Sequence, residues 1–352
     1  MKKIAVSPPS GMTFDTLFAK ECPWYAPGTA DRWEYLLREQ LALSGYKLCS
    51  AEQMLDASVI AIIHWSDISF SLLKQYPEKR HIYYGPEPHI VRPYHTHRGL
   101  RYLSRLMDQC ITSYEMNVDR ERGLSCIPGA YNYEVSFSAA LPYAERPFLL
   151  ATVSADKNAK DSKELYSQRR AVIDWFEENA PGEFHFWGAG WRESYRRYHT
   201  YGGQADCKLT CLSQAKFALC FENVKETMGC ISEKLFDAMF AETVPIYWGA
   251  DNITDYVPAD CFIDYRTLKS PENLYAYLNS MNDETYQAYR QNIKAYLASD
   301  ATQKLSYVRM GEALISSVES EKRAHPTALD VLIFKANLYA PVVWEKLHRL
   351  FR

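Results

Sequence analysis

Carboxylate, amide and lysine side chains gather in one short stretch of this sequence. Glu222 and Asn223 directly follow the apolar run Phe217–Phe221. Glu233 and Lys234 open a helical pattern after an intervening loop. Side chains at the carboxyl end of a parallel strand are placed for ligand contact. A carboxylate can accept hydrogen bonds from ribose hydroxyls, and a lysine ammonium is a compact point charge suited to phosphate. The stretch therefore predicts a site for a phosphorylated ligand that also carries hydroxyl groups.

Lys234 stands in the first turn of the expected helix, for which Ser232 is the expected N-cap. The helix dipole disfavours a cation there by roughly 0.3–1 kcal/mol, whereas Glu233 suits it. An anion held between Lys234 and the free N–H groups of the helix would offset this cost. Taken alone, the pattern also fits a solvated Glu–Lys pair at an ordinary helix start.

Metal ligation is not expected from these residue types. Cys207, Cys211 and Cys220 lack the paired spacing of a zinc site. His95 and His97 are separated by one residue and have no third ligand beside them, which is more often incidental than metal-binding. The sequence contains no Asp-x-Asp, a common clamp for divalent cations. We therefore expect neither a divalent metal nor another cofactor.

The elements that must position these residues form two successive α/β series. In the first half, helical patterns such as Asp31–Ser44 alternate with the apolar runs Ile4–Val6, Val59–Ile63, Ile82–Tyr84 and Cys110–Ser113. In the second half, the expected strands are Phe148–Val153, Phe184–Trp187, Phe217–Phe221, Val244–Trp248 and Cys261–Ile263. The expected helices there are Ser162–Asn179 and Ser232–Phe240. Such alternation is typical of parallel sheets with crossover helices.

A proline-bracketed segment, Leu141–Pro147, separates the two series and suits a linker. The 352 residues are enough for two domains of ordinary size. The predicted fold class is α/β, with two Rossmann-like domains facing a cleft and a helical C-terminal region. The expected domain ranges are 1–145, 146–325 and 326–352, and we expect the last to pack back on the first.

Composition excludes some partners and leaves others open. The net charge is −3 and no block of like charge stands out, so nucleic acid is not an expected partner. Aromatic residues make up 14% of the chain, with 26 tyrosines. Their apolar faces and polar edges suit carbohydrate, and an aromatic-rich core is the equally good alternative.

The two ends of the sequence bear on localisation. Only three apolar residues follow Met-Lys-Lys, too few for a signal peptide, and no run of 18 apolar residues predicts a transmembrane helix. Nine scattered cysteines fit a reducing compartment, so we expect a cytoplasmic protein. Trp344, Leu347 and Phe351 share one helical face among basic residues. This segment could contact the inner face of an anionic membrane, although packing on the N-terminal domain is favoured.

The stretch from Phe217 to Ala250 resembles the donor-binding signature of glycosyltransferase family 10, the α-1,3/4-fucosyltransferases, in a bacterial-type form. That signature has a Phe-Glu-Asn strand end, a Thr/Ser-Glu-Lys helix start, a Val/Ile-Pro-Ile/Val strand and a Gly-Ala or Gly-Ser turn. The matching pieces are Phe221-Glu222-Asn223, Ser232-Glu233-Lys234, Val244-Pro245-Ile246 and Gly249-Ala250. Roughly residues 148–300 match in order, and Cys230 and the loop Val224–Gly229 depart from the family pattern.

The resemblance implies a GT-B arrangement, in which the C-terminal domain binds GDP-fucose and the N-terminal domain binds the acceptor. Lys234 would then contact the diphosphate and Glu233 the ribose. Glu222 and Asn223 would line the fucose and nucleotide pocket. The family also has an arginine on the helix after the first donor-domain strand. Arg169 is the favoured counterpart, and Arg170 is the alternative.

The resemblance further implies a general base, a glutamate that follows a strand of the N-terminal domain. The candidate is Glu87, in the passage Ile82–Pro93. Its neighbouring prolines and Gly85 would hold the loop rigid, so that the carboxylate projects from fixed backbone. The alternative is an ordinary exposed loop glutamate.

The expected activity is transfer of fucose from GDP-fucose, with inversion, to a galactose- or N-acetylglucosamine-containing acceptor through an α-1,3 or α-1,4 linkage. The acceptor could be an oligosaccharide, a glycolipid or a lipopolysaccharide. The departures at Cys230 and in the preceding loop leave open an inverting GT-B enzyme with another nucleotide-sugar donor. A non-catalytic carbohydrate-binding protein is a third possibility, motivated by the aromatic content.

Overall fold

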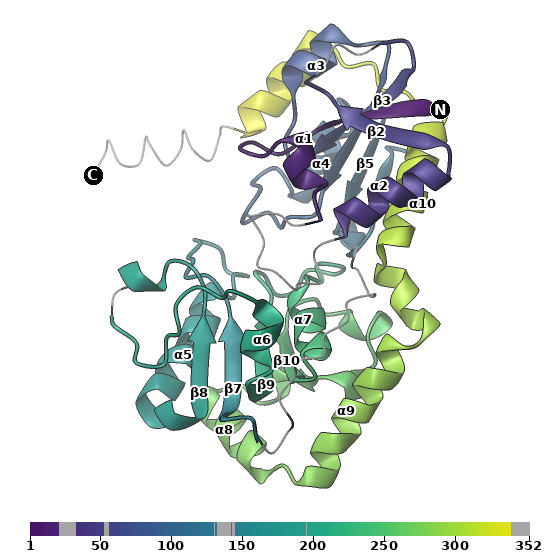
Figure 1. Ribbon diagram of the computed structural model, residues 1–352. Coiled ribbons are helices and arrows are strands. Elements are labelled where there is room, and N and C mark those ends of the chain that lie inside the picture. The colour runs from purple at the N-terminus through teal and green to yellow at the C-terminus, as the bar shows by residue number, and fades with distance from the viewer. Residues whose placement is uncertain are drawn as a thin grey trace, which may run out of the picture. The chain divides into compact units, whose positions relative to one another are not determined.

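The computed structural model describes residues 1–20, 33–52, 56–129, 131, 142, 145–194 and 196–338. Contacts within the chain divide it into two compact units, each described by itself below. The first unit comprises Met1–Lys20, Glu34–Ala130 and Tyr307–Arg352. The second unit comprises Glu21–Trp33 and Tyr131–Ser306. In Figure 1, the purple and yellow ends of the chain therefore belong to one unit and the teal and green middle to the other.

The first unit is built on a six-stranded parallel sheet with strand order β2-β1-β3-β4-β5-β6. Its strands are β1 (Lys2–Ser7), β2 (Tyr46–Ser50), β3 (Val59–Trp65), β4 (Arg80–Gly85), β5 (Gln109–Thr112) and β6 (Leu124–Cys126). Its helices include α1 (Phe14–Leu17), α2 (Glu34–Leu43), α3 (Phe70–Gln75), α4 (His97–Leu103), η1 (Glu115–Asn117) and α10 (Tyr307–Glu319). Ile4, Ala5 and Val6 are fully buried, as expected for a parallel strand covered on both faces.

Helix α10 packs beside α2 in the first unit (Figure 1). Gln40 Nε2 donates to the carbonyl of Val308 over 3.1 Å. A Cβ on Gly311 would lie 2.5 Å from Gln40 Oε1, so glycine permits this close approach. Tyr46 Oη donates to Glu319 over 2.7 Å at the other end of the helix. The first unit is thus completed by a helix that follows the second unit in the sequence.

The second unit is built on a five-stranded parallel sheet with strand order β11-β10-β9-β7-β8. Its strands are β7 (Phe148–Val153), β8 (Phe184–Trp187), β9 (Ala215–Phe221), β10 (Val244–Trp248) and β11 (Ile263–Asp264). Its α-helices are α5 (Tyr166–Asn179), α6 (Lys208–Leu212), α7 (Lys234–Phe240), α8 (Pro271–Ser280) and α9 (Asp283–Leu297). Its 3₁₀ helices are η3 (Pro181–Glu183), η4 (Trp191–Glu193), η5 (Ile253–Asp255), η6 (Ala259–Cys261), η7 (Tyr265–Thr267) and η8 (Asp300–Leu305).

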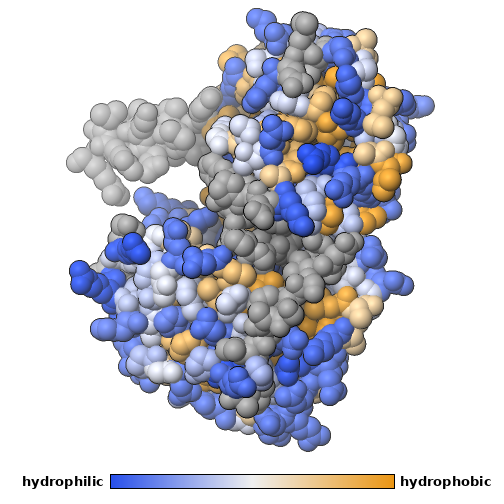
Figure 2. All heavy atoms as spheres, in the orientation of Figure 1, coloured by the Kyte–Doolittle hydropathy of each residue, from blue (hydrophilic) through white to orange (hydrophobic). Residues whose placement is uncertain are grey.

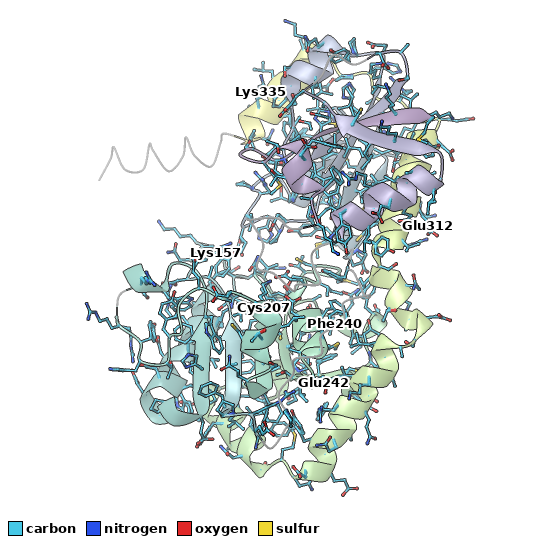
Figure 3. All side chains as sticks on the ribbon, viewed as in Figure 1. Lys157, Cys207, Phe240, Glu242, Glu312 and Lys335 are labelled. Atoms are coloured by element: carbon cyan, nitrogen blue, oxygen red, sulfur yellow. The ribbon has the colours of Figure 1, made fainter. Side chains whose placement is uncertain are left out.

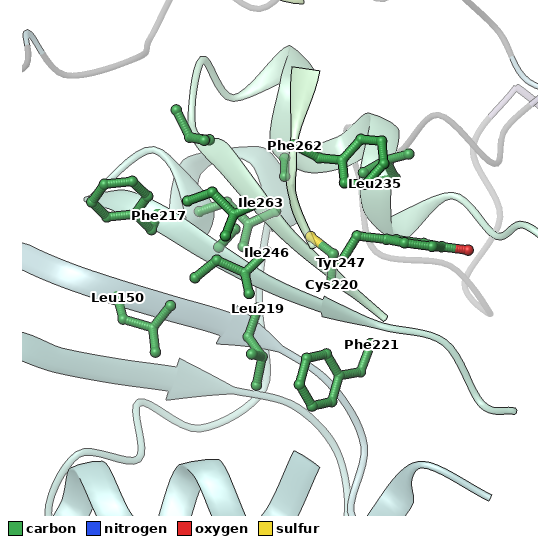
Figure 4. Packing of buried hydrophobic residues seen from close by; sticks show 14 of the residues in the cluster. Leu150, Phe217, Leu219, Cys220, Phe221, Leu235, Ile246, Tyr247, Phe262 and Ile263 are labelled. Carbon is green, nitrogen blue, oxygen red and sulfur yellow. The ribbon is translucent and has the colours of Figure 1, made fainter. Parts of the chain in front are cut away.

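The core of the second unit lies between this sheet and its helices. Figure 4 shows Phe217, Leu219 and Ile246 from the central strands with Leu235 from α7. Leu235 and Ile246 are fully buried, and Phe217 is 2% exposed. On the face of the molecule in Figure 2, hydrophilic residues dominate and hydrophobic ones form small separate patches. Burial of the apolar strands therefore fixes the carboxyl edge of the sheet, where β9 and β10 end.

The expected α/β class with two Rossmann-like parallel sheets is confirmed, as is a helical region toward the C-terminus, which contains α8, α9 and α10. The contact-based division differs from the ranges 1–145, 146–325 and 326–352. Tyr131 N donates to the Leu305 carbonyl over 2.8 Å, which ties residue 131 to the second unit. Residues 307–325 fall instead in the first unit, because α10 packs on α2.

The C-terminal segment is described only as far as residue 338, and residues 328–338 form a helix. Phe334 is fully buried in the first unit, 5.6 Å from the ring of Tyr94. Trp344, Leu347 and Phe351 lie outside the described residues. No helix in the part of the chain that the structure describes combines the length and apolarity needed to cross a bilayer.

Candidate functional site

Glu222 lies directly after β9, at the carboxyl edge of the second unit's sheet, and is 2% exposed. Its backbone N–H donates to the Trp248 carbonyl over 2.8 Å, which continues the pairing with β10. Its Oε1 accepts the backbone N–H of Ser232 over 2.7 Å. Its Oε2 lies 3.7 Å from Lys234 Nζ. The carboxylate is therefore fixed between the end of β9 and the start of α7.

Gly249 is required by the position of Glu222. A Cβ on Gly249 would lie 2.3 Å from Glu222 Cγ and 2.5 Å from Tyr247 Oη. Tyr247 Oη accepts the Ala250 N–H over 3.0 Å, so this hydroxyl is itself held by the turn. The Gly-Ala turn of the sequence motif thus has a packing reason, because no other residue leaves room for the buried carboxylate.

Lys234 is the first residue of α7, and its side chain is 19% exposed. Its Nζ donates to Ser232 Oγ over 2.9 Å and lies 3.9 Å from Glu233 Oε1. The expectation that Ser232 caps the helix is wrong. Glu233 is the N-cap residue, in helical geometry and without a side-chain cap bond. Ser232 instead uses its N–H on Glu222 and its hydroxyl on Lys234.

Burial and neighbouring charge act in opposite directions on these side chains. Burial lowers the pKa of Lys234, but Glu233 and Glu222 more than offset this, so the pKa is raised and the ammonium stays charged. Burial raises the pKa of Glu222 above its ordinary value, although Lys234 opposes the shift. Burial also raises the pKa of Glu233, but Lys208 and Lys234 outweigh it and hold that pKa below its ordinary value. The cost of a first-turn lysine is thus offset inside the chain by two carboxylates.

Lys208, which sequence reasoning missed, is the first residue of α6. It follows Cys207, which Figure 3 labels. Its Nζ lies 3.0 Å from Glu233 Oε1 and 3.2 Å from Oδ2 of Asp237, a residue that is 1% exposed. The spacing of Glu233 and Asp237, one helical turn apart, indicates an acidic pair that needs a cation. Only the packing of α6 on α7 identifies which cation that is.

Arg169 lies on α5 and is 4% exposed. Its Nη2 donates to the carbonyls of Phe221 and Glu222, over 3.0 and 3.3 Å. Burial lowers its pKa, while Tyr166, Glu222 and Glu233 favour the charged form. Arg170, the alternative candidate, pairs with Asp156 instead. Of the two arginines, Arg169 is the one that holds the end of β9.

Asn223 is half-buried, and its carbonyl accepts the Leu165 N–H over 3.0 Å. Its side-chain amide forms no hydrogen bond with the described residues. Val224 bridges to Glu164, so the chain after β9 pairs with the segment that leads into α5. The departures from the family pattern lie just beyond, where Cys230 is buried to 8% exposure. Backbone pairing therefore anchors the end of β9, and the side-chain amide of Asn223 can bind a ligand.

Aromatic rings flank this strand end. Trp248, at the end of β10, stacks on Tyr265 with ring centroids 5.5 Å apart and an interplanar angle of 28°. Phe221 meets Trp248 edge-on at 5.5 Å. Lys225 Nζ lies 5.8 Å from the centroid of the Trp248 ring. The carboxyl ends of β9 and β10 thus carry a packed aromatic cluster, in which Phe221 and Tyr265 are buried.

Glu87 lies in the first unit, in the loop after β4, and is half-buried. The loop is held on both sides by hydrogen bonds. His95 Nδ1 donates to the Glu87 carbonyl, and Ser113 Oγ donates to the Pro86 carbonyl over 2.6 Å. Tyr114 Oη accepts the His89 N–H over 2.5 Å. The backbone at Glu87 is therefore held by hydrogen bonds in addition to the neighbouring prolines.

Buried tyrosine hydroxyls hold the His95 ring, which in turn bonds to the backbone of Glu87. Its Nε2 lies 2.7 Å from Tyr83 Oη, which lies 3.0 Å from Tyr94 Oη. In a neutral ring with its proton on Nδ1, Nε2 accepts a hydrogen bond from Tyr83 Oη. Burial lowers the pKa of His95 to about 4, which favours the neutral ring. A Cβ on Gly85 would lie 2.5 Å from the Tyr83 ring and 2.7 Å from His95, so glycine is needed there.

The structure brings the five predicted donor-site residues together at one edge of the second unit: Arg169, Glu222, Asn223, Glu233 and Lys234. Glu87 lies in the first unit. Within the described ranges, His, Cys, Asp and Glu form no group of three or more that could hold a metal ion. Independence from metal stays a prediction.

The part of the chain that carries this cluster is similar to a known protein family. Residues 161–325 match the model of glycosyltransferase family 10 (fucosyltransferase), C-terminal part. The chain is 36% identical over 107 residues to the α-(1,3)-fucosyltransferase FucT of Helicobacter pylori. That match covers 26% of this chain and 22% of the Helicobacter protein. The expected resemblance to family 10 is thus confirmed for the region that carries the charged cluster, and the match spans about a fifth of that relative.

Solved structures extend the likeness to nearly the whole chain. A crystal structure of an α1,3-fucosyltransferase with GDP-fucose has a TM-score of 0.54 and 16% identity, and covers 93% of each chain. A structure of T4 phage BGT in complex with UDP and Mn²⁺ has a TM-score of 0.56 and 11% identity, and covers 90% of this chain and all of that one. Both are GT-B-like, and at these identities they show the fold alone.

Proposed function

We propose that this chain is an inverting fucosyltransferase of the bacterial type. It would transfer L-fucose from GDP-fucose to a hydroxyl of a galactose- or N-acetylglucosamine-containing glycan, through an α-1,3 or α-1,4 linkage. The observation that carries the proposal is the cluster around Lys234. It joins both halves of the sequence motif, within the region that matches family 10.

The donor would bind at the carboxyl edge of the second unit's sheet. Among the described residues, Lys234 Nζ donates one hydrogen bond, to Ser232 Oγ. An ammonium has three N–H donors, so two remain for diphosphate oxygens. Glu233 is held charged and could accept hydrogen bonds from the ribose hydroxyls. Glu222 and Asn223, at the tip of β9, would line the fucose and nucleotide pocket.

The chemistry explains why cations are fixed at this edge. Breaking the sugar–phosphate bond leaves new negative charge on an oxygen of GDP. Lys234 and Arg169 are buried to 19% side-chain and 4% residue exposure, and their positions are set by protein contacts before any ligand binds. Preorganised charge of this kind stabilises a transition state without reorganisation cost. In this proposal the two side chains take the place of a divalent metal.

Inversion requires the acceptor hydroxyl to attack from the face opposite the leaving group. A base must accept the hydroxyl proton as the new bond forms. Glu87 is the proposed base, because its backbone is fixed by His95 and by Ser113 through the neighbouring Pro86. A carboxylate on rigid backbone can be held in the narrow range of positions that proton transfer needs.

The donor is inferred from the matched region and not from the fold. The same overall fold occurs in T4 phage BGT, whose structure contains UDP, so the fold does not select GDP. The residues around Lys234 would clamp any nucleoside diphosphate. An inverting GT-B enzyme with another donor therefore remains the alternative, favoured by the changed loop before Cys230. A non-catalytic carbohydrate-binding protein would have no use for the fixed charges.

The acceptor would be an oligosaccharide, a glycolipid or a lipopolysaccharide, with no role for nucleic acid. A cytoplasmic location, with peripheral contact at the inner face of the membrane through the C-terminal segment, belongs to the same proposal. The basic and aromatic residues 344–352 motivate it.

The test is GDP release from GDP-fucose, measured with and without lactose- and N-acetyllactosamine-type acceptors. We expect acceptor-dependent release that falls by about 10²–10⁴ in Glu87→Gln. Glu312→Gln is a matched control, because Glu312 is an exposed glutamate paired with Arg309. Protection by GDP against thermal unfolding without any release would favour the other donor. Neither release nor protection would contradict the proposed site.

A further inference from the structure

We propose that Lys208 is a positioning residue of the donor site, which holds the Glu233 carboxylate away from the Lys234 ammonium and so keeps that ammonium available to an anionic ligand. The inference rests on the proposed function, because it takes the ligand to be a nucleoside diphosphate. Lys208 lies outside the sequence motif and comes from a different helix, α6.

One oxygen of Glu233 is shared unequally by two lysines. Glu233 Oε1 lies 3.0 Å from Lys208 Nζ, within hydrogen-bond distance, but 3.9 Å from Lys234 Nζ. All three side chains are at most 20% exposed, so solvent screens these charges only weakly. The hydrogen bond therefore goes to Lys208, and Lys234 is left with the longer contact.

Lys208 is itself fixed by a second carboxylate. Its Nζ lies 3.2 Å from Asp237 Oδ2, and Asp237 is 1% exposed. Asp237 N donates to the Glu233 carbonyl over 2.8 Å, so the N-cap residue Glu233 and Asp237 lie one turn apart at the start of α7. Moving Lys208 toward a ligand would withdraw this cation from a buried carboxylate, which is costly. Lys208 therefore acts on Glu233 and not on the ligand directly.

The five charges form a series of alternating sign: Asp237, Lys208, Glu233, Lys234 and Glu222. Without Lys208, the nearest cation to the Glu233 carboxylate is Lys234. A direct hydrogen-bonded pair between them would occupy the ammonium and compete with phosphate oxygens, since charged groups at contact attract strongly in a buried setting. The position of Lys208 thus sets how much of the Lys234 charge is available.

The experiment measures the affinity for GDP by calorimetry in a double-mutant cycle of the full chain. The variants are Lys208→Met, Glu233→Gln and the double variant. We expect Lys208→Met to weaken GDP binding by at least about fivefold, because Lys234 becomes occupied by Glu233. In the Glu233→Gln background the same substitution should cost less than about fivefold, because no carboxylate is left to occupy Lys234.

The conservative variant separates positioning from a general structural role. Lys208→Arg keeps the charge beside Glu233 and should bind GDP within about fivefold of the wild type. Lys294→Met is the matched control, because Lys294 also pairs with a glutamate, at 3.5 Å from Glu242. It should leave GDP affinity unchanged.

Two results would overturn the inference while the proposed function stands. In the first, the wild type binds GDP and the Lys208→Met variant binds it with an affinity within fivefold of the wild type. The other is an equal loss in both backgrounds, which would mean that Lys208 contacts the ligand. A wild type without GDP binding would instead overturn the proposed function. If Lys208→Met does not fold, Lys208→Met combined with Asp237→Asn, which removes the buried charge, replaces it in the cycle.

Discussion

The carboxylate of Glu222 and the backbone N–H of Ser232, ten residues further along the chain, are joined by a 2.7 Å hydrogen bond. This bond connects the end of β9 to Ser232, which lies two residues before the first residue of α7. It makes the two halves of the sequence motif one structural element, although a loop separates them in the sequence. The same carboxylate lies 3.7 Å from Lys234, so it also sets the charge around the proposed phosphate contact.

Removal of this bond should be distinguishable from removal of the charge. Glu222→Ala leaves the Ser232 N–H without its acceptor and opens a cavity, and should destabilise the protein by about 2–4 kcal/mol. Glu222→Gln keeps an oxygen for that N–H, although it removes the charge that lies 3.7 Å from Lys234. It should cost less than about 1 kcal/mol. Urea unfolding measures both losses, and equal losses would contradict this account.

The close approach at Gly249 predicts a local effect of a single methyl group. Gly249→Ala places Cβ 2.3 Å from Glu222 Cγ, and should destabilise the fold by about 1–3 kcal/mol and weaken GDP binding. Gly182→Ala is the control, because a Cβ there meets nothing within 4 Å. Thermal unfolding with and without GDP tests this. A Gly249→Ala variant that behaves like Gly182→Ala would show that Glu222 can move aside freely.

The two neighbouring arginines of α5 should differ in function. Arg169→Ala removes the donor that holds the carbonyls of Phe221 and Glu222, and should lower GDP affinity by about tenfold or more. Arg170→Ala removes the pair with Asp156 and should change GDP affinity by less than about threefold. Calorimetric titration with GDP compares them. The reverse order would move the donor-site assignment to Arg170.

Buried neutral histidines predict acid sensitivity. His64 and His95 are 0% and 1% exposed, and burial lowers their pKa values to about 3 and about 4. The unfolded chain, with histidine pKa values near 6.5, binds more protons below that pH. The free energy of unfolding should therefore fall as pH drops from about 6.5 toward 4, by up to about 1.4 kcal/mol per pH unit for each histidine.

Urea unfolding from pH 7.5 to 5 measures that slope. His64→Gln should flatten the slope, because one buried neutral imidazole is gone. His199→Gln should not, because the His199 side chain is 94% exposed. His64 Nε2 donates to His81 Nδ1 over 3.0 Å, so the slope includes a contribution from His81, whose pKa burial also lowers. A free energy of unfolding that does not change with pH would contradict the burial of His64, His81 and His95 as neutral imidazoles.

The strands that the sequence predicted best are those with continuous apolar runs. Ile4–Val6 and Val59–Ile63 lie in β1 and β3, which are covered on both faces. The edge strand β2 was not predicted, because its polar residues at Lys47 and Ser50 break the run. Burial produces the apolar signal, so strands that are only partly covered carry less of it.

The donor-site residues were predictable because they lie close together in sequence, around two element ends. Lys208 was not, since its relation to Glu233 is created by packing of α6 against α7. The assignment of Ser232 as N-cap failed for a related reason. Its N–H and hydroxyl are taken by Glu222 and Lys234, which lie on both sides of the helix start. Local propensity yields there to a tertiary hydrogen bond.

Helix α10 gives the first unit an unusual place in the order of synthesis. The ribosome makes the sheet of this unit first, but the helix that packs on α2 emerges only after all of the second unit. Gln40, on the face of α2 that packs on α10, bonds to Val308. During translation this face therefore has no α10 to pack on until the second unit has been made. The N-terminal unit is begun first and completed last, so truncation after residue 306 would leave the second unit whole and the first one unfinished.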